Sequence, residues 1–280
     1  MKKFLSLLLV CGAIFMASCS TDATNDIGVD VVGKNSTSIT LSLEESRTQL
    51  GEKAGDLYPL YWGEGDQISI NGVASTPLSA DAAGSTNATF SVEGSPAKPY
   101  CIAYPAASAG QVLFAEKQLH ASNSTFANGV TTLYGYSADG VSAKLTHLTG
   151  ILKISVVGSA KLVLAQISTI DRKPIAGAFD FDFESGEATA TSASKDVIEY
   201  SFGEGVQLSA EATNLHIAVP AGEYDELYIT LYDENGGVMY ATVKADESKP
   251  LNAGNVREFP RAITYQPNSN VFIVKDKASL

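Results

Sequence analysis

Short stretches in which apolar and polar residues alternate recur along most of the chain. Ile39, Leu41 and Leu43 are separated by small polar residues, and similar runs occupy 151–157 and 227–232. Such alternation places successive side chains on opposite faces of an extended strand. No stretch after the amino-terminal segment has the apolar period of a long amphipathic helix. The pattern therefore predicts an all-β fold with strands packed as sandwiches.

The expected strands are bounded by clusters of Gly, Pro, Asn and Ser, which favour turns. They lie at 38–43, 67–72, 88–92, 100–104, 112–114, 151–157, 161–167, 177–183, 187–191, 197–202, 215–219, 227–232 and 238–243. The last two flank Asp233–Gly237, whose Asn-Gly pair suits the positive φ angles of a tight reversal. A turn at Ser137–Gly140 precedes a new series of strands. We therefore expect two tandem β-sandwich domains, at 38–141 and 142–280.

The amino-terminal segment has the features of an export signal. Two lysines precede an apolar run that ends at Ala17 and is too short to cross a bilayer as a helix. Small residues lead directly into Cys19, an arrangement that resembles the lipobox of bacterial lipoproteins. We therefore predict a signal peptide at 1–18, cleavage between Ser18 and Cys19, and lipidation of Cys19. The alternative is an ordinary signal peptide cut after Ala17 or Ser18, which leaves the cysteine unmodified.

The segment that follows the predicted lipid site is expected to be a flexible tether. Residues 19–37 are rich in Ser, Thr, Asn, Asp and Gly. Ser20 rather than an aspartate follows Cys19, which by the general sorting habit of lipoproteins favours the outer membrane. Several acyl chains on Cys19 would give stable attachment to that membrane, where one chain gives only marginal attachment.

Charge and cysteine content exclude some functions. The chain has a formal net charge of −12, and its acidic residues are spread along it. An acidic surface repels the phosphate backbone, so nucleic acid is not an expected partner. Cys101 is the one cysteine beyond the predicted leader and lipid site. No intrachain disulfide is therefore expected, and the simplest role for Cys101 is that of a small buried side chain.

Residues with the spacing of a catalytic or metal site are scarce. His120, His147 and His216 have no His, Cys or acidic partner at ligand spacing. The chain also has no nucleophile elbow, phosphate loop or dinucleotide fingerprint. We therefore expect no enzyme activity, no metal and no cofactor, and structural roles for His147 and His216.

Two clusters have a functional and a structural interpretation. Asp180, Asp182 and Glu184 alternate with phenylalanines, so that a carboxylate row lies on one strand face. The row could bind calcium or act as a glycosidase pair, but a strand with one solvated face gives the same pattern and is preferred. Trp62, the only tryptophan, follows Tyr61. The pair could stack on sugar rings, but a core anchor is preferred for Trp62.

A series of short motifs occurs in a characteristic order along the chain. They are Arg47-Thr48, Tyr61-Trp62-x-Glu64-Gly65-Asp66-x-Ile68-Ser69-Ile70, Tyr100-x-x-x-Tyr104-Pro105, Leu145-x-His147-Leu148 and Leu251-Asn252-Ala253-Gly254-Asn255. Each motif is short, and their order is the stronger signal. Across residues 38–266 the chain resembles the fimbrillin family of Bacteroidales.

The resemblance implies transthyretin-like, Greek-key sandwiches exported as a lipoprotein, and a role as a structural, anchor or tip subunit of type V pili that contributes to adhesion. In such subunits an arginine-specific protease removes the lipidated leader with a first strand, and a neighbouring subunit inserts a strand into the emptied groove. Carried over to this sequence, the removed strand holds Ile39, Leu41 and Leu43, the processing point is Arg47-Thr48, and the candidate donor strand holds Val271, Phe272, Ile273 and Val274.

The expected partners are the outer membrane through the lipid on Cys19, other pilus subunits or a second copy of the chain, and a host protein or glycan. The expected location is the outer membrane, the cell surface or a fimbrium. An uncut chain would stay acylated, as anchor subunits do. The alternative function is a non-polymerising outer-membrane lipoprotein that binds host or dietary glycans through aromatics such as Tyr61 or Trp62.

Overall fold

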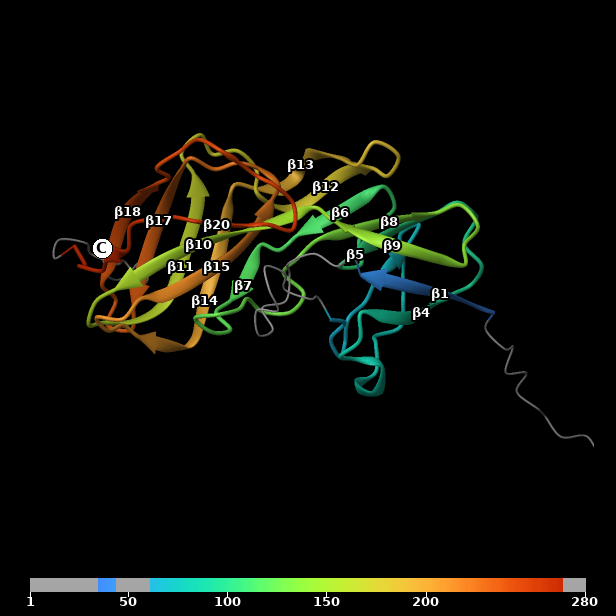
Figure 1. Ribbon diagram of the computed structural model, residues 1–280, viewed down its shortest axis with the longest axis horizontal. Helices are drawn as coiled ribbons and strands as arrows, with labels where there is room; N and C mark the ends of the chain where they lie inside the picture. The colour runs from blue at the N-terminus through green and yellow to red at the C-terminus, as the bar shows by residue number, and fades with distance from the viewer. Residues whose placement is uncertain (1–34, 44–60, 269–280) are drawn as a thin grey trace, which may run out of the picture. The chain divides into compact units, whose positions relative to one another are not determined.

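Strands dominate the part of the chain that the computed structural model describes, residues 35–43 and 61–268 (Figure 1). The one helical segment within these ranges is a 3₁₀ turn at Ala80–Ala82. Accordingly, no helix there has the length and apolar character needed to cross a bilayer. The predicted all-β class is confirmed.

One sheet has seven strands in the spatial order β3-β2-β5-β8-β9-β1-β4. They are β1 (Ser36–Leu43), β2 (Ser69–Ile70), β3 (Val73–Ala74), β4 (Asn87–Glu93), β5 (Tyr100–Tyr104), β8 (Leu133–Ser137) and β9 (Ser142–His147). Alternate apolar residues of these strands, among them Ile39, Phe90 and Leu145, pack into a single core. We call this cluster the amino-terminal core.

The two ends of the seven-stranded sheet meet. Strands β2 and β3 form a hairpin through Asn71 and Gly72, whose φ angles of +51° and +86° are those of a two-residue reversal. Directly after β3, Ser75 forms a bridge with Val92 of β4, the strand at the opposite end of the sheet order. The sheet therefore closes around the amino-terminal core, and β1 is one of the strands needed for closure.

The largest core lies between two further sheets. The first has the order β15-β10-β20, with β21 also paired to β10, and contains β10 (Thr149–Val157), β15 (Thr213–Pro220), β20 (Val256–Glu258) and β21 (Ile263–Thr264). The second has the order β18-β17-β11-β14-β7 and contains β7 (Lys117–Leu119), β11 (Lys161–Thr169), β14 (Val197–Gln207), β17 (Glu226–Asp233) and β18 (Val238–Lys244). Leu152 and Ile217 of the first sheet pack in one cluster with Ile167 and Ile229 of the second. The two sheets form a β-sandwich.

Two smaller sheets complete the described strands. They contain β6 (Gln111–Phe114), β12 (Ala176–Asp182) and β13 (Glu187–Lys195) in the first, and β16 (Gly222–Glu223) and β19 (Pro250–Leu251) in the second. Strand β6 pairs with β12, and β7 pairs with β14. Strands that precede the predicted boundary at 141/142 therefore pair with strands that follow it, and the division into two domains stays a prediction.

Long alternating runs were predicted well, and short strands were not. Strand β5 coincides with the predicted run at 100–104, whereas the strand predicted at 67–72 is limited to β2. Strand β8 was missed because Gly135 interrupts its apolar pattern. A Cβ atom at Gly135 would lie 2.6 Å from Cδ2 of Leu145, so the glycine permits the close approach of β9.

The predicted hairpin of β17 and β18 is confirmed, but its turn differs from the prediction. The positive φ angle belongs to Gly236, at +82°, and not to Asn235. Instead, the Asp233 carboxylate accepts hydrogen bonds from the backbone N–H groups of Asn235 and Gly237, at 2.9 and 2.7 Å. A side-chain acceptor thus shapes a turn that the Asn-Gly pair alone was expected to form.

Candidate functional site

Strand β1 occupies an interior position in the seven-stranded sheet. It pairs antiparallel with β4 from Ser36 to Ser42 and parallel with β9 from Thr40 to Leu43. Figure 1 shows β1 in blue beside β4. Over Thr40–Ser42 both edges of β1 are therefore paired with neighbouring backbone, and its loss would leave β4 and β9 each with an unpaired edge.

The two faces of β1 differ in character. Ile39, Leu41 and Leu43, the three residues predicted from their alternation, are 1%, 0% and 6% exposed and point into the amino-terminal core. On the other face, the Ser38 hydroxyl lies 2.8 Å from that of Ser91 on β4. The strand thus contributes three apolar side chains to the core and a polar surface to solvent.

The processing and anchoring residues predicted from the sequence lie outside the described residues. These are Ser18, Cys19, Arg47 and Thr48, together with the candidate donor residues Val271, Phe272, Ile273 and Val274. Their roles stay predictions. Along the chain, β1 follows Cys19 and precedes Arg47. A cut at Arg47 would therefore separate β1 from residues 61–268.

Trp62 is a core residue, as preferred from the sequence. Its side chain is 2% exposed, and its ring makes edge contacts with Phe90 on β4 and Tyr104 on β5, with centroids 4.8 and 5.3 Å away. The Tyr104 hydroxyl donates to Asp66 at 2.9 Å, and burial raises the pKa of the Asp66 carboxyl despite hydrogen bonds from Gly63 and Tyr104. A buried ring cannot stack on a sugar, so Trp62 is excluded as a glycan contact.

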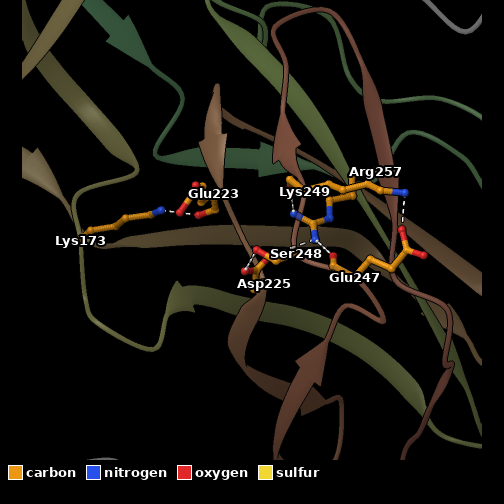
Figure 2. Close-up of polar contacts among 7 residues, drawn as sticks. All are labelled: Lys173, Glu223, Asp225, Glu247, Ser248, Lys249 and Arg257. Carbon is orange, nitrogen blue, oxygen red and sulfur yellow. Dashed lines mark hydrogen bonds and ion pairs between the residues drawn. The ribbon is translucent and has the colours of Figure 1, made fainter.

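The exposure of each arginine side chain determines whether an arginine-specific protease can reach it. Figure 2 shows Arg257 within a polar network, where Nη2 donates to the Asp225 carboxylate at 3.0 Å and to the Glu247 carbonyl at 2.6 Å. Its Nη1 donates to the Lys249 carbonyl, and Ser248 donates to Asp225. Hydrogen bonds from Ser248 and Arg257 hold the pKa of the Asp225 carboxyl below its usual range. The Arg257 side chain is 12% exposed and therefore shielded.

Two other described arginines are more accessible than Arg257. Arg172 lies in a turn with a φ angle of +57°, and its side chain is 61% exposed although Nε lies 3.6 Å from Asp196. Arg261 is also exposed. Arg172 is consequently a useful comparison for Arg47 in any test of selective processing.

The carboxylates of the predicted row are solvated, as preferred from the sequence, but Asp180 and Asp182 alone lie on β12, and Glu184 follows in a turn because the strand ends at Asp182. Asp180 accepts a hydrogen bond from Gln111 at 3.0 Å, and Asp182 accepts from the backbone N–H groups of Glu184 and Ser185. These bonds lower the pKa of the Asp182 carboxyl. Within residues 35–43 and 61–268, no three His, Cys, Asp or Glu side chains gather as a potential metal site.

The sequence predicted a buried Cys101, but the residue is only half-buried on β5. Burial, with a smaller contribution from the negative charge of Glu184, raises the pKa of its thiol. A raised pKa keeps the thiol protonated near neutral pH and disfavours a nucleophilic role.

Two histidines meet beside Tyr200 in the sandwich. His216 is 4% exposed, its backbone N–H donates to the Tyr200 hydroxyl at 3.4 Å, and its Nδ1 has no hydrogen-bond partner. His120 Nδ1 lies 3.3 Å from the same hydroxyl. Burial, then the charges of Lys153 and His120, lower the pKa of His216 to about 4. The imidazole is therefore neutral at neutral pH, as expected for a structural histidine.

Acid should destabilise the protein through His216. The unfolded side chain titrates near a pKa of about 6.5, so only the unfolded state gains a proton as the pH falls below that value. Above about pH 6.5 the His216 side chain is neutral in both states and leaves the free energy of unfolding unchanged. As the pH falls from about 6.5 towards 4, the free energy of unfolding decreases by roughly 2–3 kcal/mol. Urea unfolding at several pH values checks this, with His216→Gln showing a weaker pH dependence than the wild type. Equal pH dependence in the two proteins would contradict the assignment.

Comparisons with known proteins give structural neighbours only. No family model matches the chain, and no curated protein matches it. A proposed cell adhesion protein from Bacteroides ovatus aligns with 83% of this chain and 92% of its own, at 9% identity and a TM-score of 0.48. The alignment with a proposed cell adhesion protein from Bacteroides fragilis covers 83% of this chain and 95% of that protein, at 12% identity and a TM-score of 0.39.

A third solved structure carries a fimbrial name. It is a fimbrial protein from Bacteroides ovatus that aligns with 81% of this chain and 50% of its own, at 12% identity and a TM-score of 0.33. This chain therefore spans half the length of that protein. All three neighbours share 12% sequence identity or less with this chain.

Proposed function

We propose that the chain is a non-enzymatic subunit of a surface pilus, in a structural, anchor or tip position, that is exported through its leader, lipidated on Cys19 and assembled by strand exchange. The observation that carries the proposal is the place of β1, which is interior to a closed sheet, supplies three buried side chains and lies between the predicted lipid site and Arg47. One cut at Arg47 would release both the anchor and this strand from the rest of the chain.

The energetic consequence of that release supports strand exchange. Burying one Leu or Ile side chain contributes roughly 1.5–3 kcal/mol, so loss of the three on β1 removes on the order of 5–9 kcal/mol. This is comparable to the total stability of a typical domain, about 5–15 kcal/mol. The cut chain would also expose backbone donors and acceptors on β4 and β9. A strand from another subunit restores both kinds of contact.

The geometry of β1 specifies what the incoming strand must do. It must run antiparallel to β4 and parallel to β9, and place an apolar residue at every second position. The segment Val271–Val274 is apolar and is the candidate donor. In this proposal the partner is a second copy of the chain or another subunit with such a segment, and adhesion follows from the assembled fibre.

The test is the amino terminus and lipid content of the protein isolated from native outer membranes. We expect a cut subunit to begin at Thr48 and to lack lipid, and an anchor subunit to carry labelled palmitate on Cys19. Arg47→Ala should abolish the cut, whereas Arg172→Ala should leave it unchanged. Cys19→Ser should abolish palmitate incorporation, whereas Cys101→Ala should retain it. A chain that begins elsewhere and never incorporates palmitate would overturn the proposal.

A further inference from the structure

A cluster of tyrosines lies on the outer face of the sheet that contains β17 and β18. On β17, Leu227, Ile229 and Leu231 are buried in the sandwich core, so the alternate residues Tyr228 and Tyr232 point away from it. Tyr240 of the neighbouring strand β18 lies on the same outer face. We refer to Tyr228, Tyr232 and Tyr240 as the tyrosine face.

Two rings of the tyrosine face are exposed and nearly parallel. Tyr228 and Tyr240 are 39% and 48% exposed, their centroids are 6.2 Å apart, and their planes differ by 22°. In the strand register Tyr240 is opposite Thr230 and Tyr228 is opposite Thr242, so the rings are diagonal neighbours. Two adjacent strands thus present a continuous aromatic surface to solvent.

Polar groups surround these rings. The Tyr232 hydroxyl donates to Gln166 Oε1 on β11 at 3.0 Å, which fixes the third ring beside the pair. The hydroxyls of Tyr228 and Tyr240 make no hydrogen bond to another described residue, and both can donate and accept. The surface therefore combines aromatic rings with hydroxyl groups that can donate to and accept from a ligand.

One acidic and one basic residue lie opposite each other beside the tyrosine face. Glu226 of β17 pairs in register with Lys244 of β18 at the end of the two strands nearest Tyr228. The chain as a whole carries a net charge of −12, which disfavours acidic partners. An uncharged ligand fits this surface better than an anionic one.

We propose that the tyrosine face binds a neutral carbohydrate. A sugar ring presents an apolar C–H face that packs on an aromatic ring, and hydroxyls that exchange hydrogen bonds with tyrosine and threonine. Tyr228 and Tyr240 would provide the stacking surface, while Tyr232 and Thr242 border it. The proposal goes beyond strand exchange and does not depend on it, because β17 and β18 lie in a different sheet from β1.

The alternative role for these rings is stabilisation of the sheet alone. Cross-strand aromatic pairs make a small contribution to folding stability. A stabilising pair predicts a small change in unfolding on mutation and no binding, whereas a ligand site predicts loss of binding in a protein that remains folded.

Isothermal titration of the full chain with cellohexaose and with mannohexaose tests the proposal, with heparin as an acidic comparison. We expect the wild type to bind at least one neutral hexasaccharide and not heparin. Tyr240→Ala, on the sheet-edge strand, should weaken that binding about tenfold or more. Tyr228→Phe, which keeps the ring, should retain most of it.

The matched control is Tyr136→Ala, which removes a ring of 44% exposure from the seven-stranded sheet. We expect this variant to bind as the wild type does. The proposal is overturned if neither neutral hexasaccharide binds the wild type at millimolar concentration, or if Tyr136→Ala weakens binding as much as Tyr240→Ala. Because the titration uses uncut protein, its failure would leave the evidence for strand exchange unchanged.

Discussion

Replacement of Leu41 by aspartate is expected to unfold the seven-stranded sheet. Leu41 is fully buried in the amino-terminal core. The variant loses the packing of a leucine, which alone costs roughly 2–5 kcal/mol, and places a carboxylate among the apolar side chains of that core. Far-UV circular dichroism and urea unfolding should show a loss of more than about 4 kcal/mol, a large share of the stability of a typical domain.

Thr40→Asp is the matched control for this change. Thr40 is the preceding residue on the same strand but lies on the solvated face, where its hydroxyl is 3.1 Å from that of Thr89. The same carboxylate remains hydrated there, and the expected loss is about 1 kcal/mol or less. If Thr40→Asp and Leu41→Asp destabilise the protein equally, the assigned orientation of β1 is wrong.

A chain that begins at Thr48 should have a disrupted amino-terminal core. It lacks β1, and with it the side chains of Ile39, Leu41 and Leu43, whose burial contributes roughly 5–9 kcal/mol. The core of the sandwich contains no residue of β1. We therefore expect the seven-stranded sheet to unfold at lower urea than the sandwich.

Trp62 allows this loss to be observed locally. It is the only tryptophan of the chain and belongs to the same cluster as the three β1 side chains. Its fluorescence should shift to longer wavelength in the shortened chain, because removal of β1 admits water to the cluster. An unshifted emission maximum and unchanged urea unfolding would show that β1 is dispensable to this core.

Local alternation allowed the long strands to be predicted from the sequence. The faces of β1, β12 and β17 follow directly from period-two patterns, and so do the solvated carboxylates of β12. Trp62 was also correctly placed in the core, since an apolar ring beside a strand entry gains more from burial than from exposure.

Pairing between distant segments could not be predicted in this way. The parallel contact of β1 with β9 joins residues about a hundred positions apart, and no local pattern encodes it. Strands of two or three residues, such as β3 and β20, exist because a neighbour pairs with them. The tyrosine face was missed because Tyr228 and Tyr240 lie on different strands and become neighbours only through the register of the hairpin.

The central claim is that the place of β1 can be filled by a separate strand. The most direct measurement is the fluorescence anisotropy of a labelled peptide of residues 35–43, titrated with the chain that begins at Thr48. We predict saturable uptake that restores the Trp62 emission, no uptake of a peptide carrying Leu41→Asp, and no uptake by the intact chain, whose own β1 fills the site. Failure of the shortened chain to take up the peptide, or equal uptake of both peptides, would contradict the account.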